Sequence, residues 1–142
     1  MIWITPPTLA AINAMGKATL VDHLGIVFTE IGPDFLRATM PVDHRTVQPM
    51  RLLHGGASVA LAESMGSVAS SFCLPDLATQ SVVGVEINAN HLSSTPEGSM
   101  VTATVSPIKV GRILHVWEIK IHRPDDRLIC VSRITIAVVA RR

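Results

Sequence analysis

The sequence carries little charge of either sign. Charged residues make up only 16% of the 142 residues, and Lys+Arg 12 against Asp+Glu 11 leave a formal net charge of +1. Nucleic-acid-binding domains usually show a clear basic excess, so this balance argues against a general nucleic-acid partner. Hydrophobic residues reach 48%, which indicates a globular chain that hides part of its surface in a homo-oligomer.

Long apolar runs are also missing. No stretch approaches the roughly 18 uncharged apolar residues that a membrane-spanning helix needs, so no membrane span is expected. The start, Met-Ile-Trp-Ile-Thr-Pro-Pro, lacks the basic region and following apolar run of a signal peptide. We therefore expect a cytoplasmic protein whose two cysteines, Cys73 and Cys130, are free and buried.

Several common catalytic signatures are absent. The run Gly56-Ala57-Ser58-Val59-Ala60 lacks the second glycine of a serine-hydrolase elbow. The six histidines show no tight metal-ligand spacing, and the cysteines form no Cys-x-x-Cys pair. The glycines form no dinucleotide fingerprint. We therefore expect neither a metal nor a retained cofactor.

Hydrophobic periodicity predicts two helices and six strands in one domain of residues 1–142. A short helix covers residues 8–15, with Thr8 as its N-cap. A longer, buried helix rich in Ala, Gly and Ser runs from about Gly55 to Cys73. The predicted strands cover residues 26–31, 35–42, 81–92, 100–109, 112–123 and 128–140. One apolar helix followed by four strands favours an α+β fold in which an antiparallel sheet wraps around that helix.

Both faces of the later strands are largely apolar. One face of the run 112–123 carries Ile113, Trp117, Ile119 and Ile121. The other face carries Leu114 and Val116. We expect the first face to pack on the central helix and the second to be covered by a partner subunit.

Glu63 is the most informative residue. It lies among Ala, Leu and Met inside the predicted central helix, eight residues after Gly55. The turn His54-Gly55-Gly56 stands where that helix should begin, and a helix start presents free backbone N–H groups. A base or nucleophile and an oxyanion-binding group are the two parts needed for acyl transfer. An acid satisfied by solvent and a merely flexible turn are equally compatible with these residues alone.

Five segments carry a family resemblance: VDHRTVQP at 42–49, LLHGGA at 52–57, LAES at 61–64, VGVEINANHL at 83–92, and Gly111-Arg112. Together they resemble the hotdog-fold acyl-CoA thioesterases over essentially the whole chain. More narrowly, they are similar to the branch of the phenylacetate-pathway, Glu-dependent hydroxybenzoyl-CoA, dihydroxynaphthoyl-CoA and enterobactin-proofreading thioesterases. The resemblance implies the hotdog fold, an antiparallel sheet wrapped around one long central helix, in a dimer that assembles into a tetramer.

The resemblance also implies a catalytic set. Glu63 would attack the thioester carbonyl or activate a water to do so, and the N–H of Gly55 would bind the oxyanion. Gln48 would polarise or orient the thioester, and His54 would shape the active-site loop. Ser67 follows Glu63 by one helical turn. It would hold the water or the acid, or serve only as a small packing residue.

A substrate-binding set is implied in the same way. The acyl pocket or pantetheine tunnel would be lined by Gly84, His91, Leu92, Ser93 and Ser94. The CoA phosphates would be contacted by Lys109, Val110, Gly111 and Arg112, since Lys and Arg suit phosphate. The alternative is that the first group is only the exposed end of a strand and the second only a solvated turn.

These features predict an enzyme that hydrolyses an acyl-CoA thioester to the free acid and CoA, with an aromatic acyl group favoured by the resemblance alone. Two alternatives stay open. One is the same hydrolysis of an acyl or aryl group held on a carrier protein, and the other is a non-catalytic acyl-CoA-binding module. A hydratase of the same fold would need a different Asp/His arrangement.

Helix geometry predicts where the site is assembled. Eight residues at roughly 1.5 Å rise each separate Gly55 from Glu63 by about 12 Å along one helix. Both groups must approach one carbonyl to within about 3 Å. We therefore expect a two-fold dimer in which Gly55 and Gln48 of one subunit face Glu63 of the other. The alternative is that Gly55 only forms a turn and another group binds the oxyanion.

Overall fold

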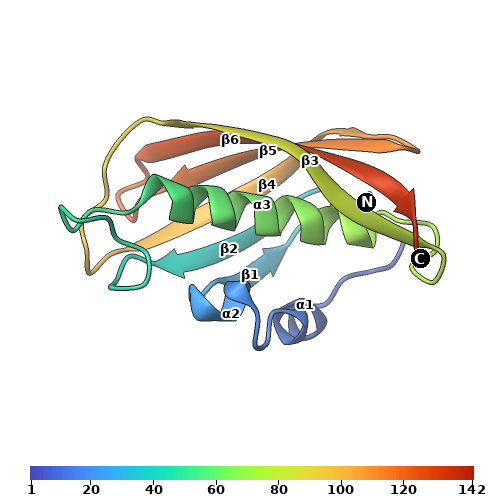
Figure 1. Ribbon diagram of the computed structural model, residues 1–142, viewed down its shortest axis with the longest axis horizontal. Coiled ribbons are helices and arrows are strands. Elements are labelled where there is room, and N and C mark those ends of the chain that lie inside the picture. Colours follow the sequence, from blue (N-terminus) through green and yellow to red (C-terminus); the bar gives the residue numbers. More distant parts are fainter.

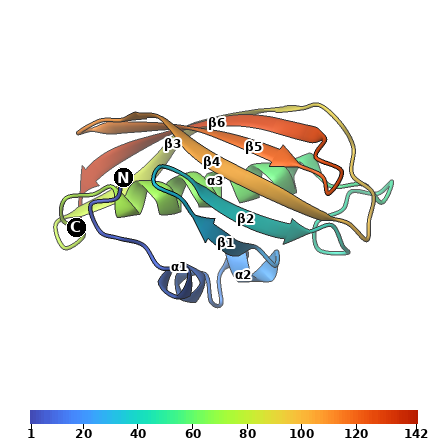
Figure 2. The same cartoon turned by 180° about the vertical axis from the view of Figure 1, so that it is seen from behind.

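A computed structural model describes residues 1–142 as a six-stranded antiparallel sheet curved around one long helix (Figures 1 and 2). The helices are α1 (Leu9–Met15), α2 (Leu20–His23) and α3 (Gly55–Phe72). The strands are β1 (Val27–Ile31), β2 (Leu36–Pro41), β3 (Gln80–His91), β4 (Met100–Val110), β5 (Leu114–His122) and β6 (Leu128–Ala140). They are ordered β1-β2-β4-β5-β6-β3 across the sheet. The predicted fold is confirmed, and every strand bound lies within two residues of its prediction.

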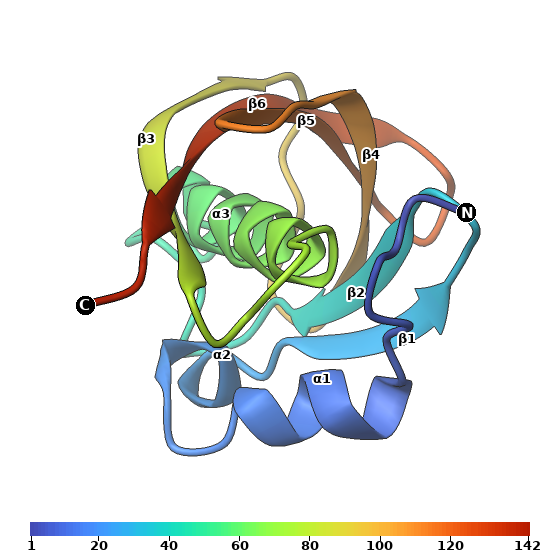
Figure 3. The same ribbon diagram turned by 90° about the vertical axis from the view of Figure 1, so that its right-hand side faces the viewer.

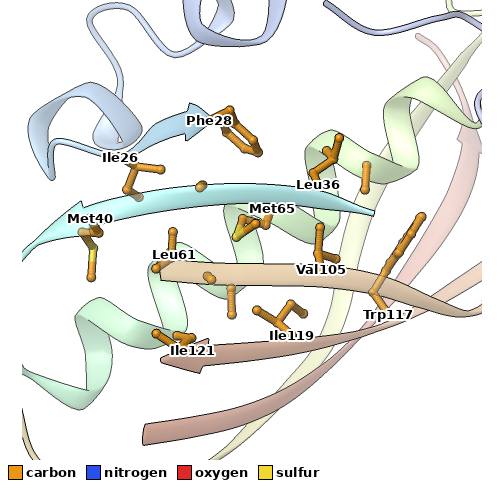
Figure 4. Close-up of a cluster of buried hydrophobic side chains, with 14 of the residues drawn as sticks. Ile26, Phe28, Leu36, Met40, Leu61, Met65, Val105, Trp117, Ile119 and Ile121 are labelled. Atoms are coloured by element: carbon orange, nitrogen blue, oxygen red, sulfur yellow. The ribbon is translucent and has the colours of Figure 1, made fainter. Parts of the chain in front are cut away.

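The helix α3 occupies the concave side of the sheet, as the view close to its axis shows (Figure 3). Its Leu61 and Met65 are fully buried against Ile119 and Ile121 of β5 in the core (Figure 4). The antiparallel sheet therefore buries one face on α3, and β5 shows the alternation of buried and more exposed residues that such a sheet requires.

A tryptophan of β5 ties the amino-terminal segment to the core. Trp117 donates from Nε1 to Oγ of Ser70 at 2.7 Å, and both residues are buried. The ring of Trp3 stacks on the ring of Trp117 with 6.4 Å between the centroids. The N–H groups of Ile4 and Thr5 both donate to the carbonyl of Phe72, the last residue of α3. The segment before α1 thus closes over the carboxyl end of α3.

The two edges of the sheet differ in whether their outward backbone groups are hydrogen-bonded. At the β1 edge, the side chain of Asn13 in α1 donates to the carbonyl of Phe28 at 3.0 Å and accepts from its N–H at 2.9 Å. These bonds occupy backbone groups that an edge strand would otherwise leave open. The β3 edge has no neighbouring strand, and its Val83 and Val85 are 46% and 61% exposed. A second copy of the chain could therefore pair with β3 but not readily with β1.

The prediction for Ile113 is wrong. Ile113 is 63% exposed, because the chain turns before β5 and the strand begins only at Leu114. The inward position next to Trp117 is taken by His115, which is buried with its ring edge-on to the indole. Burial lowers the pKa of His115. Leu114 lies on the outer face and is 40% exposed.

One short element left no signal in the sequence. The four residues of α2 are too few to show a helical hydrophobic period. Thr19 caps α2 by accepting from the N–H of Val21, as Thr8 caps α1 by accepting from that of Ala11. None of the three helices combines the length and the apolar character that a membrane-spanning helix requires.

The two cysteines are buried and unpaired, as predicted. Burial raises the pKa of the Cys73 thiol to about 11. The neutral thiol is a weak nucleophile, so Cys73 serves as a small core residue.

Gly66 determines how closely α3 approaches the sheet. A Cβ atom at this position would lie 2.5 Å from Cγ2 of Ile134 in β6. Close-packed carbon atoms do not approach to that distance. Only glycine therefore allows the observed separation of α3 and β6.

We predict that Gly66→Ala destabilises the fold. Overpacking a core costs about 1–3 kcal/mol, and the better helix propensity of alanine offsets about 1 kcal/mol of it, so a net loss of up to about 2 kcal/mol is expected. In an Ile134→Ala background, where Cγ2 is gone, the same change should stabilise the protein. Urea unfolding of the four proteins measures both effects. Equal destabilisation in the two backgrounds would show that the contact with Ile134 is not the cause.

Candidate active site

A cavity of about 420 Å³ opens at the amino-terminal end of α3. Its volume lies within the range of small-molecule sites. Its walls come from the loop before α3, the first turn of α3, the end of β3 with the loop after it, and β6. The lining residues are Gln48, Leu52, Leu53, Gly55, Ser58, His91, Ser93, Ser94 and Ile129. The fold therefore brings together Gln48, Gly55, His91, Ser93 and Ser94, which the sequence singled out from two distant segments.

The first turn of α3 presents a free backbone N–H to this cavity. His54 is the N-cap, and its Nδ1 accepts a hydrogen bond from the N–H of Gly56 at 2.7 Å. The N–H groups of Ala57 and Ser58 donate to the carbonyl of His54. The N–H of Gly55 makes no hydrogen bond within the chain. Because a helix amino terminus carries partial positive charge, this group is suited to bind an oxyanion.

Gly55 also leaves room for a histidine. A Cβ at Gly55 would lie only 2.9 Å from Nε2 of His91, the last residue of β3. The His91 imidazole, which is exposed, therefore lies beside the free N–H. A side chain at position 55 would displace the ring or block this N–H.

Gln48 is held in a tight turn beside the same cavity. Its N–H donates to the carbonyl of Leu52 at 2.8 Å, and its carbonyl accepts from the N–H of Arg51 at 2.9 Å. Its side-chain Oε1 accepts a hydrogen bond from the N–H of Met50. An N–H requires an acceptor, so the oxygen of the amide must face Met50. The NH₂ group of Gln48 is left free to donate.

Glu63 lines a different and smaller cavity, of about 110 Å³. The other residues around it are Gly84, Val85, Glu86 and Ile87 of β3, and Ile134 of β6. A Cβ at Gly84 would lie 3.0 Å from Oε1 of Glu63, so this glycine makes room for the carboxylate. Glu63 is exposed and has no hydrogen bond or ion pair within the chain. Its carboxylate is available to a substrate or to a second subunit.

The remaining candidates lie outside both cavities. Ser67 is half-buried on α3, and Leu92 is 57% exposed after the end of β3. The β4–β5 hairpin tip carries Lys109, Val110, Gly111 and Arg112. This tip and the start of α3 lie at opposite ends of the molecule (Figures 1 and 2). Within one subunit the hairpin is therefore remote from Gly55.

Four residues of the larger cavity were missed in the sequence: Leu52, Leu53, Ser58 and Ile129. Ser58 follows Gly55 at the i+3 spacing that places two residues on one helix face, so a signal for it was present. Ile129 gave none, because only the sheet order brings β6 next to the end of β3. No three His, Cys, Asp or Glu side chains gather anywhere as a possible metal-ligand set.

Comparisons with known proteins agree with this architecture. Residues 50–130 match the family model of the Thioesterase superfamily. Over 139 residues the chain is 52% identical to the 1,4-dihydroxy-2-naphthoyl-CoA hydrolase of Escherichia coli, covering 98% of this chain and 100% of that protein. It is 48% identical over 139 residues to the proofreading thioesterase EntH of Cronobacter sakazakii, covering 98% and 99%.

A solved thioesterase structure resembles this protein in three dimensions as well as in sequence. The crystal structure of thioesterase HI1161 from Haemophilus influenzae matches with a TM-score of 0.93 at 48% identity, covering 99% of this chain and 96% of that one. The family model covers the central helix and β3 to β5, whereas the sequence and three-dimensional likenesses extend over nearly the whole chain. The chain belongs to the Thioesterase superfamily, as a thioester hydrolase with the hotdog fold.

Proposed function

We propose that the protein hydrolyses an aromatic acyl-CoA thioester to the free acid and CoA. The observation that carries this proposal is the pair of unengaged donors at one cavity, the N–H of Gly55 and the NH₂ of Gln48. In this proposal both would donate to the thioester carbonyl oxygen, where negative charge develops when the carbon is attacked. A non-catalytic binding module would have no need of such donors together with the free carboxylate of Glu63.

Glu63 supplies the attack in this proposal. Its carboxylate either adds to the carbonyl carbon or takes a proton from a water molecule as that water adds. In both routes the C–S bond then breaks, and CoA leaves as the thiol once its sulfur is protonated. In the first route a water molecule must afterwards cleave the glutamyl anhydride. Both routes consume one water and need no metal, redox group or retained cofactor.

The larger cavity suits an aromatic acyl group that carries polar substituents. Leu52, Leu53 and Ile129 provide apolar contact, whereas the hydroxyls of Ser93 and Ser94 can hydrogen-bond to ring substituents. The E. coli relative is named for a substrate of this kind, a dihydroxynaphthoyl-CoA. We therefore extend the proposal to hydroxylated aromatic acyl groups, with His91 among the residues that line the cavity.

A thioester held on a carrier protein is the second candidate substrate. Ile108 and Ile113 are 52% and 63% exposed on the β4–β5 hairpin, beside Lys109 and Arg112. A basic surface with apolar residues would suit an acidic carrier as well as the phosphates of CoA. Comparing hydrolysis of one acyl group on CoA and on a carrier protein distinguishes the two.

We also propose that each active site is shared by two subunits. In one chain, Gly55 and Glu63 line different cavities. Their eight-residue separation on α3 corresponds to about 12 Å. The free edge of β3 offers an apolar, unpaired strand to a second copy. The dimer would thus be the catalytic unit, and pairs of dimers could associate through the outer sheet face that carries Leu114 and Val116.

One register of β3 pairing would bring the donors of one subunit next to the Glu63 carboxylate of the other. Gly84 lies beside Glu63, and His91 lies beside Gly55. Antiparallel pairing of Gly84 with the partner's His91 places a two-fold axis between Ile87 and Asn88 of the two strands. Glu63 of each subunit would then approach the donors of the other, which creates two equivalent sites.

Replacement of Glu63 tests the chemistry. We expect Glu63→Ala to remain folded and to bind a non-hydrolysable substrate analogue, while kcat falls by about 10²-fold or more because the attacking or activating group is lost. Glu63→Asp should recover little, since it retracts the carboxylate by about 1 Å. Thiol release from aromatic acyl-CoAs, followed with a thiol reagent, measures the rates. Glu63→Ala with most of the wild-type rate would rule out this mechanism.

Replacement of Arg112 tests whether the β4–β5 hairpin binds the CoA phosphates. If Lys109 and Arg112 of one subunit meet the CoA phosphates, Arg112→Ala should raise KM more than it lowers kcat. The phosphates lie far from the reacting carbonyl and are bound equally in the ground and transition states. The defect should be much smaller with a truncated pantetheine thioester. An equal loss on both substrates would assign Arg112 a structural role.

Subunit mixing tests the shared site. Gln48→Ala and Glu63→Ala homodimers should each be nearly inactive. After co-refolding in equal amounts, about half of the dimers are mixed, and each mixed dimer carries one intact site of two, so roughly a quarter of wild-type activity should return. Differently tagged subunits confirm that exchange occurred. Exchange without recovered activity would show that Gln48 and Glu63 act from the same subunit.

A further inference from the structure

We propose that Arg51 is a positioning residue that aims the side-chain amide of Gln48, an inference that rests on the role proposed for Gln48 above. Arg51 has a backbone φ of 62°, in the left-handed region that favours glycine. It is the last of the three loop residues 49–51, which join Gln48 to Leu52 just inside the paired residues Val47 and Leu53. The N–H of Gln48 donates to the carbonyl of Leu52 and so closes this loop. Such three-residue hairpin loops usually carry glycine at the left-handed position. An arginine here therefore strains the backbone. The contacts of its side chain give a reason why arginine rather than glycine stands at this position.

The Arg51 side chain joins the two loops that form the cavity wall. Its Nε donates to Oε2 of Glu97 at 2.9 Å, and its Nη2 donates to Oε1 of the same carboxylate. The carbonyl of Arg51 accepts from the N–H of Glu97 at 3.1 Å. Glu97 belongs to the loop after β3, which also carries Ser93 and Ser94. A bidentate ion pair and a backbone bond thus fasten the Gln48 turn to the opposite wall.

The Arg51–Glu97 pair affects the substrate only through the two residues whose backbone N–H groups bind Gln48. The N–H of Met50 binds the side-chain oxygen of Gln48, and the N–H of Arg51 binds its backbone carbonyl. The direction of the free NH₂ group therefore depends on the loop to which Arg51 belongs. Exposed ion pairs add little to stability, whereas small displacements of an oriented group can cost much of its contribution to the rate. We therefore assign the Arg51–Glu97 pair to orientation of Gln48.

The test compares Arg51→Gly in the wild-type and Gln48→Ala backgrounds. Glycine accepts the left-handed conformation and removes the ion pair, so the unfolding temperature should stay equal or rise. In contrast, kcat should fall several-fold with little change in KM, because the Gln48 contact strengthens only as charge develops on the oxygen. In the Gln48→Ala background, Arg51→Gly should cause no further loss. Arg51→Lys, which keeps the charge but not the bidentate fork, should recover part of the rate.

A matched control is available at the far end of the sheet. Arg37 pairs with Glu30 at 2.7 Å, and both side chains are about half-exposed, at 45% and 48%. Arg37→Ala removes an ion pair that does not touch the cavity and should leave kcat unchanged. It shows whether loss of any surface ion pair slows the enzyme.

Three results would overturn the role of Arg51. The first is wild-type kcat in Arg51→Gly while Gln48→Ala is slow. The second is an equal loss of kcat in both backgrounds, which would mean that Arg51 does not act through Gln48. The third is a loss of kcat that accompanies a lower unfolding temperature, which would make Arg51 structural. Failure of the wild-type protein to release thiol would instead count against the proposed function itself.

Discussion

The close approach of α3 to the sheet is the constraint on which the rest of the molecule depends. At three contacts an added Cβ would collide with a neighbour: Gly66 with Ile134, Gly84 with Glu63, and Gly55 with His91. The first contact allows the core to close, and the other two make room for the side chains of the candidate site. The same packing that stabilises the fold therefore sets the position of the carboxylate and of the free N–H.

This packing also separates the two groups of candidate site residues within one chain. The donors at the start of α3 and the carboxylate in its middle open into separate cavities because one straight helix carries both. The sheet has one edge closed by Asn13 and one edge, β3, without a neighbour. An edge that adjoins both groups is a suitable place for the second subunit that the proposed chemistry requires.

The donors at the cavity are held by local hydrogen bonds rather than by burial. His54 occupies the N–H of Gly56, which leaves that of Gly55 open, and Met50 occupies the oxygen of Gln48, which leaves its NH₂ open. In each case a neighbouring residue satisfies the adjacent polar group, so the donor itself stays free. In the proposed mechanism such donors would need little rearrangement as charge develops on the carbonyl oxygen.

The type and order of the long elements follow from the residues alone, because hydrophobic period reflects local backbone geometry. The sequence also singled out Glu63, Gly55 and Gln48, through the unusual acid in an apolar helix and the family resemblance. The outward turn of Ile113 at the hairpin and the place of Ile129 in the cavity wall became visible only in three dimensions. The structure alone showed that Arg51 and Glu97 join two loops. These features arise from sheet order and from contacts between distant segments, which no local pattern of residues encodes.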